Sequence, residues 1–98
     1  MNDKTYNGWT NYATWRVNLE IFDNWRLGDI AGYEDQEPET AEAYELGQIL
    51  KQYVEELLDE QSPSDGIANA YAHAFIDEVN WFEIAQHMIE DEIQSVKA

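Results

Sequence analysis

The sequence contains no cysteine, and this absence removes several kinds of chemistry at once. Disulfide bonds, thiolate zinc sites and cysteine nucleophiles all require the missing thiol. The chain also lacks any run approaching the ~18 apolar residues that would span a bilayer, and its first residues do not pair a basic segment with an apolar one as secretory signals do. We therefore expect a cytoplasmic protein.

Positively charged residues are also scarce. Of 98 residues, 5 are Lys or Arg and 21 are Asp or Glu, which gives a formal net charge of −16 at pH 7. A chain this acidic repels phosphate groups, so we expect it to bind neither nucleic acid nor an anionic membrane directly. Because self-repulsion on this scale opposes folding, the acids indicate either an adaptation to solvent or a partner that binds anions.

Apolar residues, by contrast, are plentiful. They make up 44% of the chain and include 4 Trp, 6 Tyr and 3 Phe, whereas the chain has 2 Pro and 5 Gly. A sequence with this much large apolar surface can form a packed core, which argues against disorder. At this length we expect residues 1–98 to form a single acidic helical domain.

The stretch 39–60 predicts the longest helix, because it lacks Pro and its apolar residues recur at the steps of an amphipathic helix. These apolar residues are Leu46, Ile49, Leu50, Tyr53, Val54, Leu57 and Leu58. The acids that mostly lie off this stripe are Glu39, Glu42, Glu45, Glu55, Glu56, Asp59 and Glu60. We therefore expect one side of this helix to be buried and the other to present negative charge.

An earlier helix is predicted from an N-cap at Thr10 or Asn11 to about Trp25, after a turn at Asn7-Gly8. Its expected inner side consists of Tyr12, Trp15, Leu19, Phe22 and Arg26, with Val17 and Ile21 off that line. The β-branched and aromatic content of residues 14–22 leaves a strand as the alternative.

Two more helices are predicted toward the C-terminus. Ser62-Pro63-Ser64-Asp65 is a start signal for a helix to about Val79, and Asn80 with Glu83 forms a capping box for a helix to about Val96. The expected inner face of the first of these is Ile67, Ala70, Tyr71, Ala74, Phe75 and Glu78. The predicted fold is thus an all-α bundle of three to four helices with an irregular N-terminal arm, and the alternative is an α+β fold with a short strand in the first third.

Residues with the potential for catalysis do not form a recognisable set. His73 with Asp77, Glu83 with His87, and His87 with Asp91 are each four residues apart, but a zinc site needs three or four ligands and di-iron bundles use Glu and His three apart. No motif places a base beside a Ser, and no Gly-rich phosphate loop exists. We expect no catalytic residue, metal site or cofactor, and interpret the protein as not an enzyme.

Two aromatic blocks resemble a known family. Tyr6-Asn7-Gly8-Trp9-Thr10-Asn11-Tyr12-Ala13-Thr14-Trp15 is similar to the opening of small uncharacterised proteins encoded by phages, plasmids and prokaryotic genomes, and Val79-Asn80-Trp81-Phe82-Glu83-Ile84-Ala85 is similar to their second block. The resemblance implies a mobile element and a prokaryotic host cell, and carries no known activity. Physically, we expect Trp9, Trp15 and Trp81 to clamp the core rather than to form a ligand-binding aromatic cage.

The acidic helix leads to the functional hypothesis of a nucleic-acid mimic. Seven acids along ~33 Å give one charge per ~5 Å, whereas duplex DNA has one per ~1.7 Å, so acids from other segments must lie beside this helix. The expected partner-binding residues are Glu42, Glu45, Glu55, Glu56, Asp59, Glu60, Glu34, Asp35, Glu37, Glu83, Glu90 and Asp91. The partner would be a host DNA- or RNA-binding protein, such as a restriction or CRISPR effector. The alternative is a protein-interaction module or homodimer that uses an aromatic surface, with acids serving solubility.

Overall fold

The structure is a computed structural model that describes residues 6–30, 32–34, 37–61 and 66–97. The described elements are α1 (Tyr12–Val17), the π-helical turn η1 (Asn18–Phe22), the 3-10 turns η2 (Leu27–Asp29) and η3 (Pro38–Thr40), α2 (Ala43–Gln61), α3 (Ile67–Ile76) and α4 (Trp81–Lys97). Within these residues there is no strand beyond an isolated bridge between Tyr6 and Trp9. The all-α fold is confirmed, and the strand alternative is wrong.

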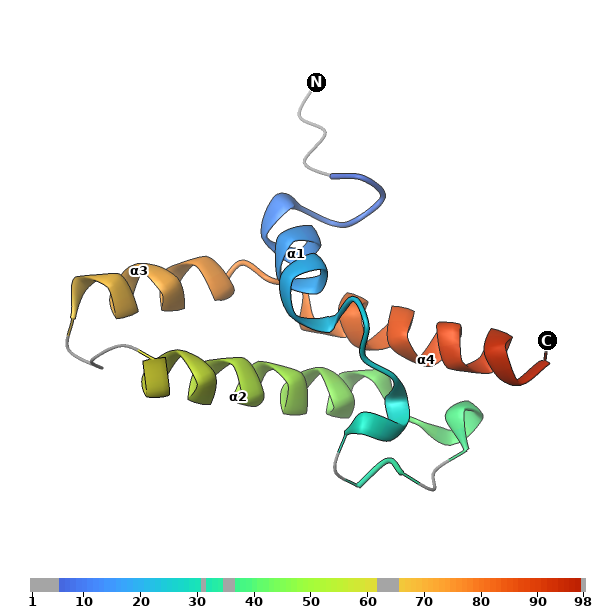
Figure 1. The fold of residues 1–98 in the computed structure, drawn as a ribbon. Coiled ribbons are helices and arrows are strands. Elements are labelled where there is room, and N and C mark those ends of the chain that lie inside the picture. The colour runs from blue at the N-terminus through green and yellow to red at the C-terminus, as the bar shows by residue number, and fades with distance from the viewer. Residues whose placement is uncertain (1–5, 31, 35–36, 62–65, 98) are drawn as a thin grey trace.

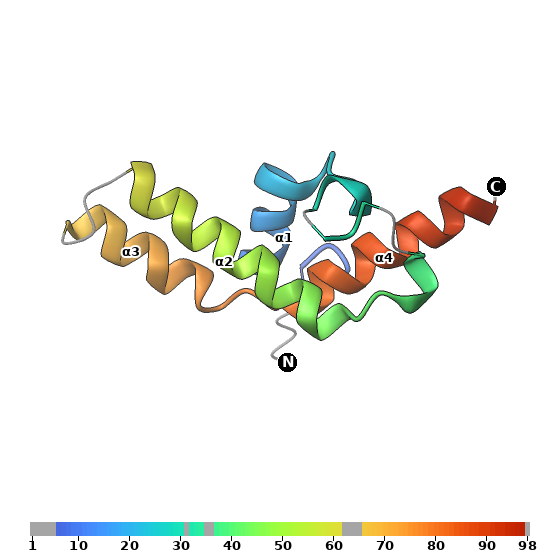
Figure 2. The same cartoon turned by 90° about the horizontal axis from the view of Figure 1, so that it is seen from below.

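The long helix α2 organises the arrangement of the others. α4 runs antiparallel beside its N-terminal half and α3 beside its C-terminal half, so that these two helices follow one another along α2 (Figure 1). The segment from α1 through η2 covers one side of this layer (Figure 2). The molecule is flat, with extents of 45 × 38 × 20 Å, and this shape leaves much of the outer side of α2 uncovered.

α2 begins later than the sequence predicts, and Gln61 is its last described residue. Pro38 starts a separate 3-10 turn, and Ala41 is extended, so residues 39–42 lie outside the helix. The Glu42 carboxylate then accepts a hydrogen bond from the backbone N–H of Glu45 at 2.9 Å, as an N-cap does. The predicted inner stripe is correct in part: its three fully buried members are Leu46, Leu50 and Val54.

The first helix begins as expected and ends differently. Asn11 caps it by accepting from the backbone N–H of Thr14 at 2.9 Å, but the helix ends at Phe22 and its last turn is π-helical. A π-turn brings side chains five residues apart onto one side, which buries Val17 and Phe22 together. The predicted inner side is therefore wrong for Tyr12, Leu19 and Arg26, which are exposed.

Of the predicted inner face of α3, Phe75 packs half-buried against the core, but most of the other members are exposed. The inward side of α3 carries Asn69 and Ile76, whereas Ile67 and Tyr71 are 71% and 72% exposed. On the inward side, Asp59 of α2 accepts a hydrogen bond from Asn69 Nδ2 at 3.1 Å, which gives the buried amide a partner. The helix also ends at Ile76 rather than Val79, and its predicted start signal lies outside the described residues.

The N-terminal arm is ordered where it is described. Asn7 and Gly8 both have positive φ angles, 50° and 87°, as the two central residues of a type I′ hairpin turn require. Tyr6 and Trp9 exchange two backbone hydrogen bonds of 2.8 Å across this turn. The predicted turn is confirmed, and it directs Trp9 back onto α4, where Trp9 packs against the core.

Candidate functional site

The two blocks that carry the family resemblance lie against each other. The backbone N–H of Thr10 donates to Glu83 Oε1 at 2.9 Å, and the backbone N–H of Asn80 donates to the Thr14 hydroxyl at 2.8 Å. Thr14 is completely buried. These contacts join the start of α1 to the start of α4, so the two blocks are hydrogen-bonded to each other.

The predicted capping box of α4 forms in half. Asn80 Oδ1 accepts from the backbone N–H of Glu83 at 3.1 Å, as expected, but the Glu83 carboxylate binds Thr10 instead of returning to Asn80. Asn11 Nδ2 adds a hydrogen bond of 2.8 Å to the carbonyl oxygen of Glu78. The Glu83 carboxylate is therefore already engaged by a backbone donor that lies 73 residues away in the sequence.

The three tryptophans of these blocks have different environments. Trp81 is buried in the core at 7% exposure, whereas Trp9 and Trp15 are half-buried. Trp9 stacks on His87 with ring centroids 4.1 Å apart, and Trp15 contacts Tyr6 at 4.7 Å. The core-clamp interpretation applies fully to Trp81 and only in part to the two N-terminal indoles.

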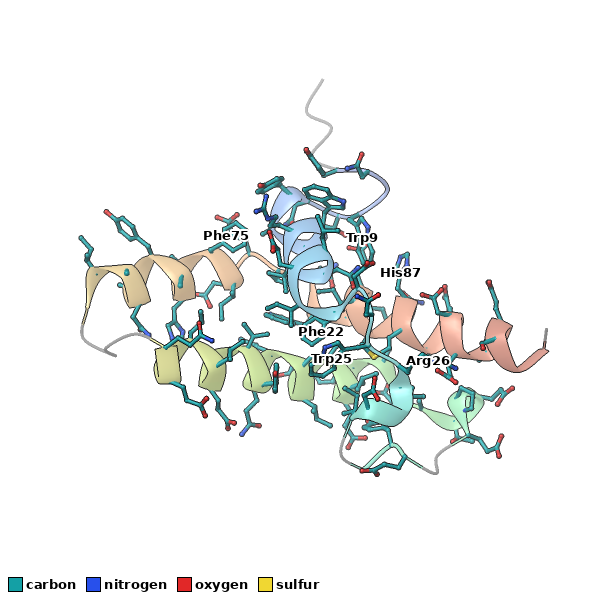
Figure 3. All side chains as sticks on the ribbon, viewed as in Figure 1. Trp9, Phe22, Trp25, Arg26, Phe75 and His87 are labelled. Carbon is teal, nitrogen blue, oxygen red and sulfur yellow. The ribbon has the colours of Figure 1, made fainter. Side chains whose placement is uncertain are left out.

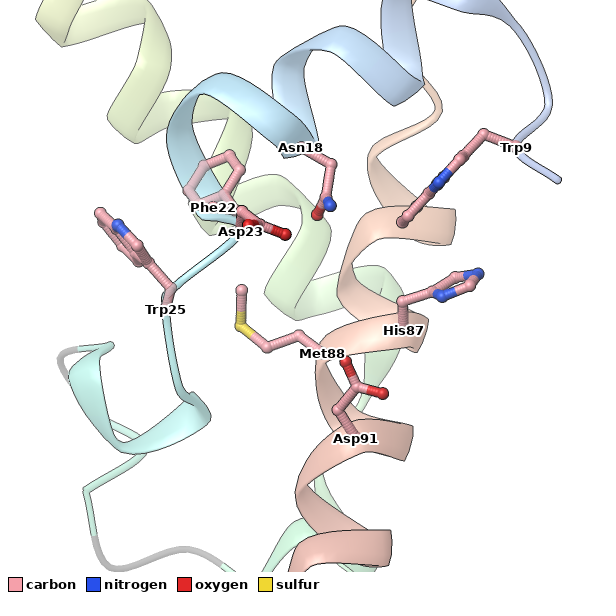
Figure 4. Close-up of a pocket in the computed structure, with 8 residues that line it drawn as sticks. All are labelled: Trp9, Asn18, Phe22, Asp23, Trp25, His87, Met88 and Asp91. Atoms are coloured by element: carbon pink, nitrogen blue, oxygen red, sulfur yellow. The ribbon is translucent and has the colours of Figure 1, made fainter. Parts of the chain in front are cut away.

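A small polar pocket lies between η1 and α4, where Asn18 and Asp23 point into the space above Met88 (Figure 4). Its volume is about 70 Å³, and Asp91 is the one expected partner-binding acid that lines it. An adjoining cleft of about 360 Å³ contains the ion pair between Arg26 and Glu92. The carboxylate and amide oxygens of this region can accept hydrogen bonds from a cation.

The His and Asp candidates for a metal site are separated by the fold. His73 Nε2 lies 3.2 Å from Asp59 Oδ1, Asp77 caps the C-terminus of α3, and His87 stacks on Trp9. Among the residues that the structure describes, no three His, Asp or Glu side chains are grouped to hold a metal ion.

The expected acidic row on α2 consists of two groups rather than a continuous line. Residues 46–54 contain no acid, so Glu42 and Glu45 form one group and the acids from Glu55 to Glu60 form the other. Glu45 and Glu56 are about 16 Å apart along the helix axis at ~1.5 Å per residue. The second group thus consists of Glu55, Glu56, Asp59 and Glu60.

The loop acids extend the first of these groups. Burial first, and then the charges of Glu45 and Glu42, raise the pKa of Tyr33, which places this loop residue beside the two carboxylates. Glu34 follows Tyr33 and accepts from the backbone N–H of Gly32 at 3.0 Å. Glu37 is exposed, Asp35 lies outside the described residues, and Glu90 and Asp91 are exposed on α4.

An apolar pocket of about 280 Å³ separates the two acidic groups. Trp25 contacts Tyr53 edge-to-face, with ring centroids 5.0 Å apart, above α2 (Figure 3). The described residues that line the pocket are Trp25, Asp29, Ile30, Ile49, Leu50 and Tyr53. Sequence reasoning assigned Ile49 and Tyr53 to the buried stripe and did not identify this pocket, because η2 and the residues before it supply the opposite wall.

Few cations balance the acids. Within the described residues, three close pairs join a basic and an acidic side chain: Arg16 with Glu20, Arg26 with Glu92, and His73, which is charged only when protonated, with Asp59. The Arg26 guanidinium, which donates two hydrogen bonds to Glu92, holds the pKa of that carboxyl below its ordinary value. The two acidic groups of α2 contribute only Asp59 to these pairs, so their field is largely uncompensated.

None of the described helices is both long enough and apolar enough to cross a membrane. No curated protein and no solved structure matches this chain. A family model does match, and it extends over almost the entire sequence. Through this match of residues 2–98, the chain belongs to DUF7249, a family of unknown function.

Proposed function

We propose that this protein is a non-enzymatic inhibitor that binds the basic groove of a host DNA- or RNA-binding protein in a prokaryotic cytoplasm. The acidic groups of α2 would occupy positions that phosphates take in the natural complex, as in an anti-restriction or anti-CRISPR protein. The observation that carries the proposal is the exposed, uncompensated charge on one side of α2, with Glu42 and Glu45 at one end and Glu56 and Glu60 at the other.

The spacing of the two groups supports this proposal better than the number of acids does. A separation of about 16 Å is similar in scale to the ~12 Å width of the DNA major groove, whose two edges carry phosphates. A groove that binds duplex DNA presents its cations in two rows at such a spacing. Two carboxylate groups with an acid-free stretch between them can therefore engage both rows.

The test is competition for a basic partner. The tagged protein would be used to capture host proteins at low and high salt, and the captured protein would then be challenged with duplex DNA or RNA. Because exposed charges are screened within about 8 Å at physiological ionic strength, we expect capture to weaken steeply with salt. Nucleic acid should release the partner, because both ligands would occupy the same groove.

Charge-neutralised variants make this test specific. Glu42→Gln with Glu45→Gln, and Glu56→Gln with Glu60→Gln, should each slow association with the captured partner, because complementary charge acts mainly on the association rate. The matched control is Asp77→Asn with Glu78→Gln, which removes the same charge at the junction of α3 and α4. If the α2 variants associate as fast as this control, the proposal is wrong.

A second candidate function is a protein-interaction module that uses an apolar surface. The outer side of α3 favours it, because Ile67 and Tyr71 are 71% and 72% exposed on a helix that has further Ala residues there. In this case Ile67→Ser with Tyr71→Ser should abolish partner capture or dimer formation, as measured by light scattering. The α2 variants would then leave binding unchanged.

A further inference from the structure

The apolar pocket on α2 gives the acidic surface a defined centre. Glu45, Ile49, Tyr53, Glu56 and Glu60 recur at intervals of four, four, three and four residues, which places them on one side of the helix. Glu42 precedes the helix and caps it beside Glu45. Along the helix, this stripe therefore has an acidic part, an apolar part and a second acidic part.

The apolar centre of this stripe is both accessible and hollow. Ile49 is 36% exposed and Tyr53 is 42% exposed, although both border a pocket of about 280 Å³. Trp25 forms the opposite wall and is held edge-to-face by Phe22, with ring centroids 4.9 Å apart. The wall is thus fixed by the core, and an apolar side chain entering the pocket would contact aromatic and aliphatic surfaces.

The charges around the pocket decide what can occupy it. Asp29 lines one edge, Glu42 and Glu45 lie toward one end, and Glu56 and Glu60 lie toward the other. A second copy of this chain would bring the same acids against each other, and a net charge of −16 opposes that contact. The complementary occupant is a basic one with an apolar side chain at its middle.

We propose that this stripe is the docking site for a basic amphipathic helix of the partner protein. The inference rests on the proposed function and specifies which element of the partner is bound. An apolar side chain of that helix enters the pocket between Trp25, Ile49 and Tyr53. Lys or Arg side chains about one and a half turns to either side lie over the two acidic groups, because a span of ~16 Å corresponds to about 11 helical residues.

The experiment uses three synthetic helical peptides against the full-length chain. The first carries Leu at its centre and Lys near both ends, the second replaces this Leu with Ser, and the third replaces each Lys with Glu. Binding is measured by anisotropy of a labelled peptide at low salt. We expect the Leu peptide to bind about tenfold more tightly than the Ser peptide, since burial of one aliphatic side chain is worth at least this factor. The Glu peptide should not bind.

Two protein variants locate the contact. Ile49→Ser should remove most of the difference between the Leu and Ser peptides, whereas the control Tyr71→Ser, on the exposed side of α3, should preserve it. Far-UV circular dichroism would verify that both variants remain helical. The comparison of the two peptides on the unmodified protein does not depend on either variant being folded.

The possible failures separate this inference from the proposed function. If the Leu and Ser peptides bind equally and Glu56→Gln with Glu60→Gln weakens both, the acidic surface stands and the docking pocket is wrong. If none of the peptides binds while nucleic acid still releases the captured host protein, the helix proposal is overturned and the inhibitor proposal survives. Concentration-dependent dimer formation that Ile49→Ser abolishes would identify a second copy as the occupant and also overturn the inference.

Discussion

Gly47 of α2 lies directly against the backbone of Trp81 at the start of α4. A Cβ atom at this position would be 2.9 Å from the carbonyl oxygen of Trp81 and 3.0 Å from its carbonyl carbon. These atoms belong to a helix and cannot rotate away as a side chain can. The close approach of α2 and α4 therefore depends on the missing side chain of Gly47.

Gly47→Ala should destabilise the protein, although the same substitution usually stabilises a helix by roughly 0.5–1 kcal/mol. The added Cβ forces α2 away from α4 and loosens the core around Leu46 and Leu50, which are completely buried. A loss of roughly 1–3 kcal/mol, typical of overpacking, should be measured by urea denaturation. Gly28→Ala is the matched control, because a Cβ there meets no atom within 4 Å. A Gly47→Ala protein as stable as this control would contradict the packing argument.

Thr14→Val should disconnect the two blocks. The Thr14 hydroxyl donates to Asn11 Oδ1 at 2.7 Å and accepts from the backbone N–H of Asn80, whereas a methyl group can do neither. Because the site is fully buried, the unpaired groups should cost about 1–3 kcal/mol of unfolding free energy. Thr14→Ser retains the hydroxyl and should lose less stability. Equal losses for the two variants would assign the effect to packing rather than to hydrogen bonding.

The tryptophans should respond in proportion to their burial. Trp81→Ala removes a buried side chain and should cost about 3–5 kcal/mol, which approaches the entire stability of many domains of this size. Trp15 is half-buried in a surface aromatic cluster with Tyr6 and Tyr12, so Trp15→Ala should cost only about 1–2 kcal/mol. Thermal melts of the two variants measure this difference. If Trp15→Ala lost more stability than Trp81→Ala, Trp81 would belong to a recognition surface rather than to the core.

Asp59 should make stability dependent on acid pH. Hydrogen bonds from Asn69 and then from His73 hold the pKa of its carboxyl below the ordinary value. The depressed pKa means that this contribution is fully present above the unfolded-state pKa of about 4 and is lost as the pH falls through the lower folded-state pKa. The stability difference between the unmodified protein and Asp59→Asn should therefore be largest near neutral pH and should shrink on acidification. If this stability difference stayed constant down to about pH 3, the Asp59 carboxylate would not be what stabilises the packing of α3 on α2.

Local signals were predictable from the sequence where the neighbouring residues alone decide the conformation. Asn80 was identified as an N-cap, the first cap was narrowed to Thr10 or Asn11, and Asn7-Gly8 was identified as a turn, because each motif closes within three or four residues. The inner face of α1 was not predictable, since the π-turn that buries Val17 with Phe22 changes the helical period and depends on tertiary contacts.

The face of α3 and the candidate site required information that a single helix does not contain. Apolar periodicity favoured Ile67 and Tyr71, but the inward side carries Asn69, whose amide bonds to Asp59 on another helix. Similarly, the acids and apolar residues of α2 were identified individually. The pocket between them became visible only when Trp25 was positioned by the fold, because residues 23–30 have no periodic pattern.

The hydrogen bonds between the two blocks have a consequence for synthesis of the chain. Thr10 and Asn11 bond to partners 73 and 67 residues later, and Asn80 bonds back to Thr14 across 66 residues. Contacts this distant in sequence form late during folding, because a long loop must close first. During translation, the first helix must therefore wait for nearly all the remaining residues before it is secured. A ribosome that stops before Asn80 would release a chain whose first helix lacks its hydrogen-bond partners, and such a product should be an early target of proteolysis.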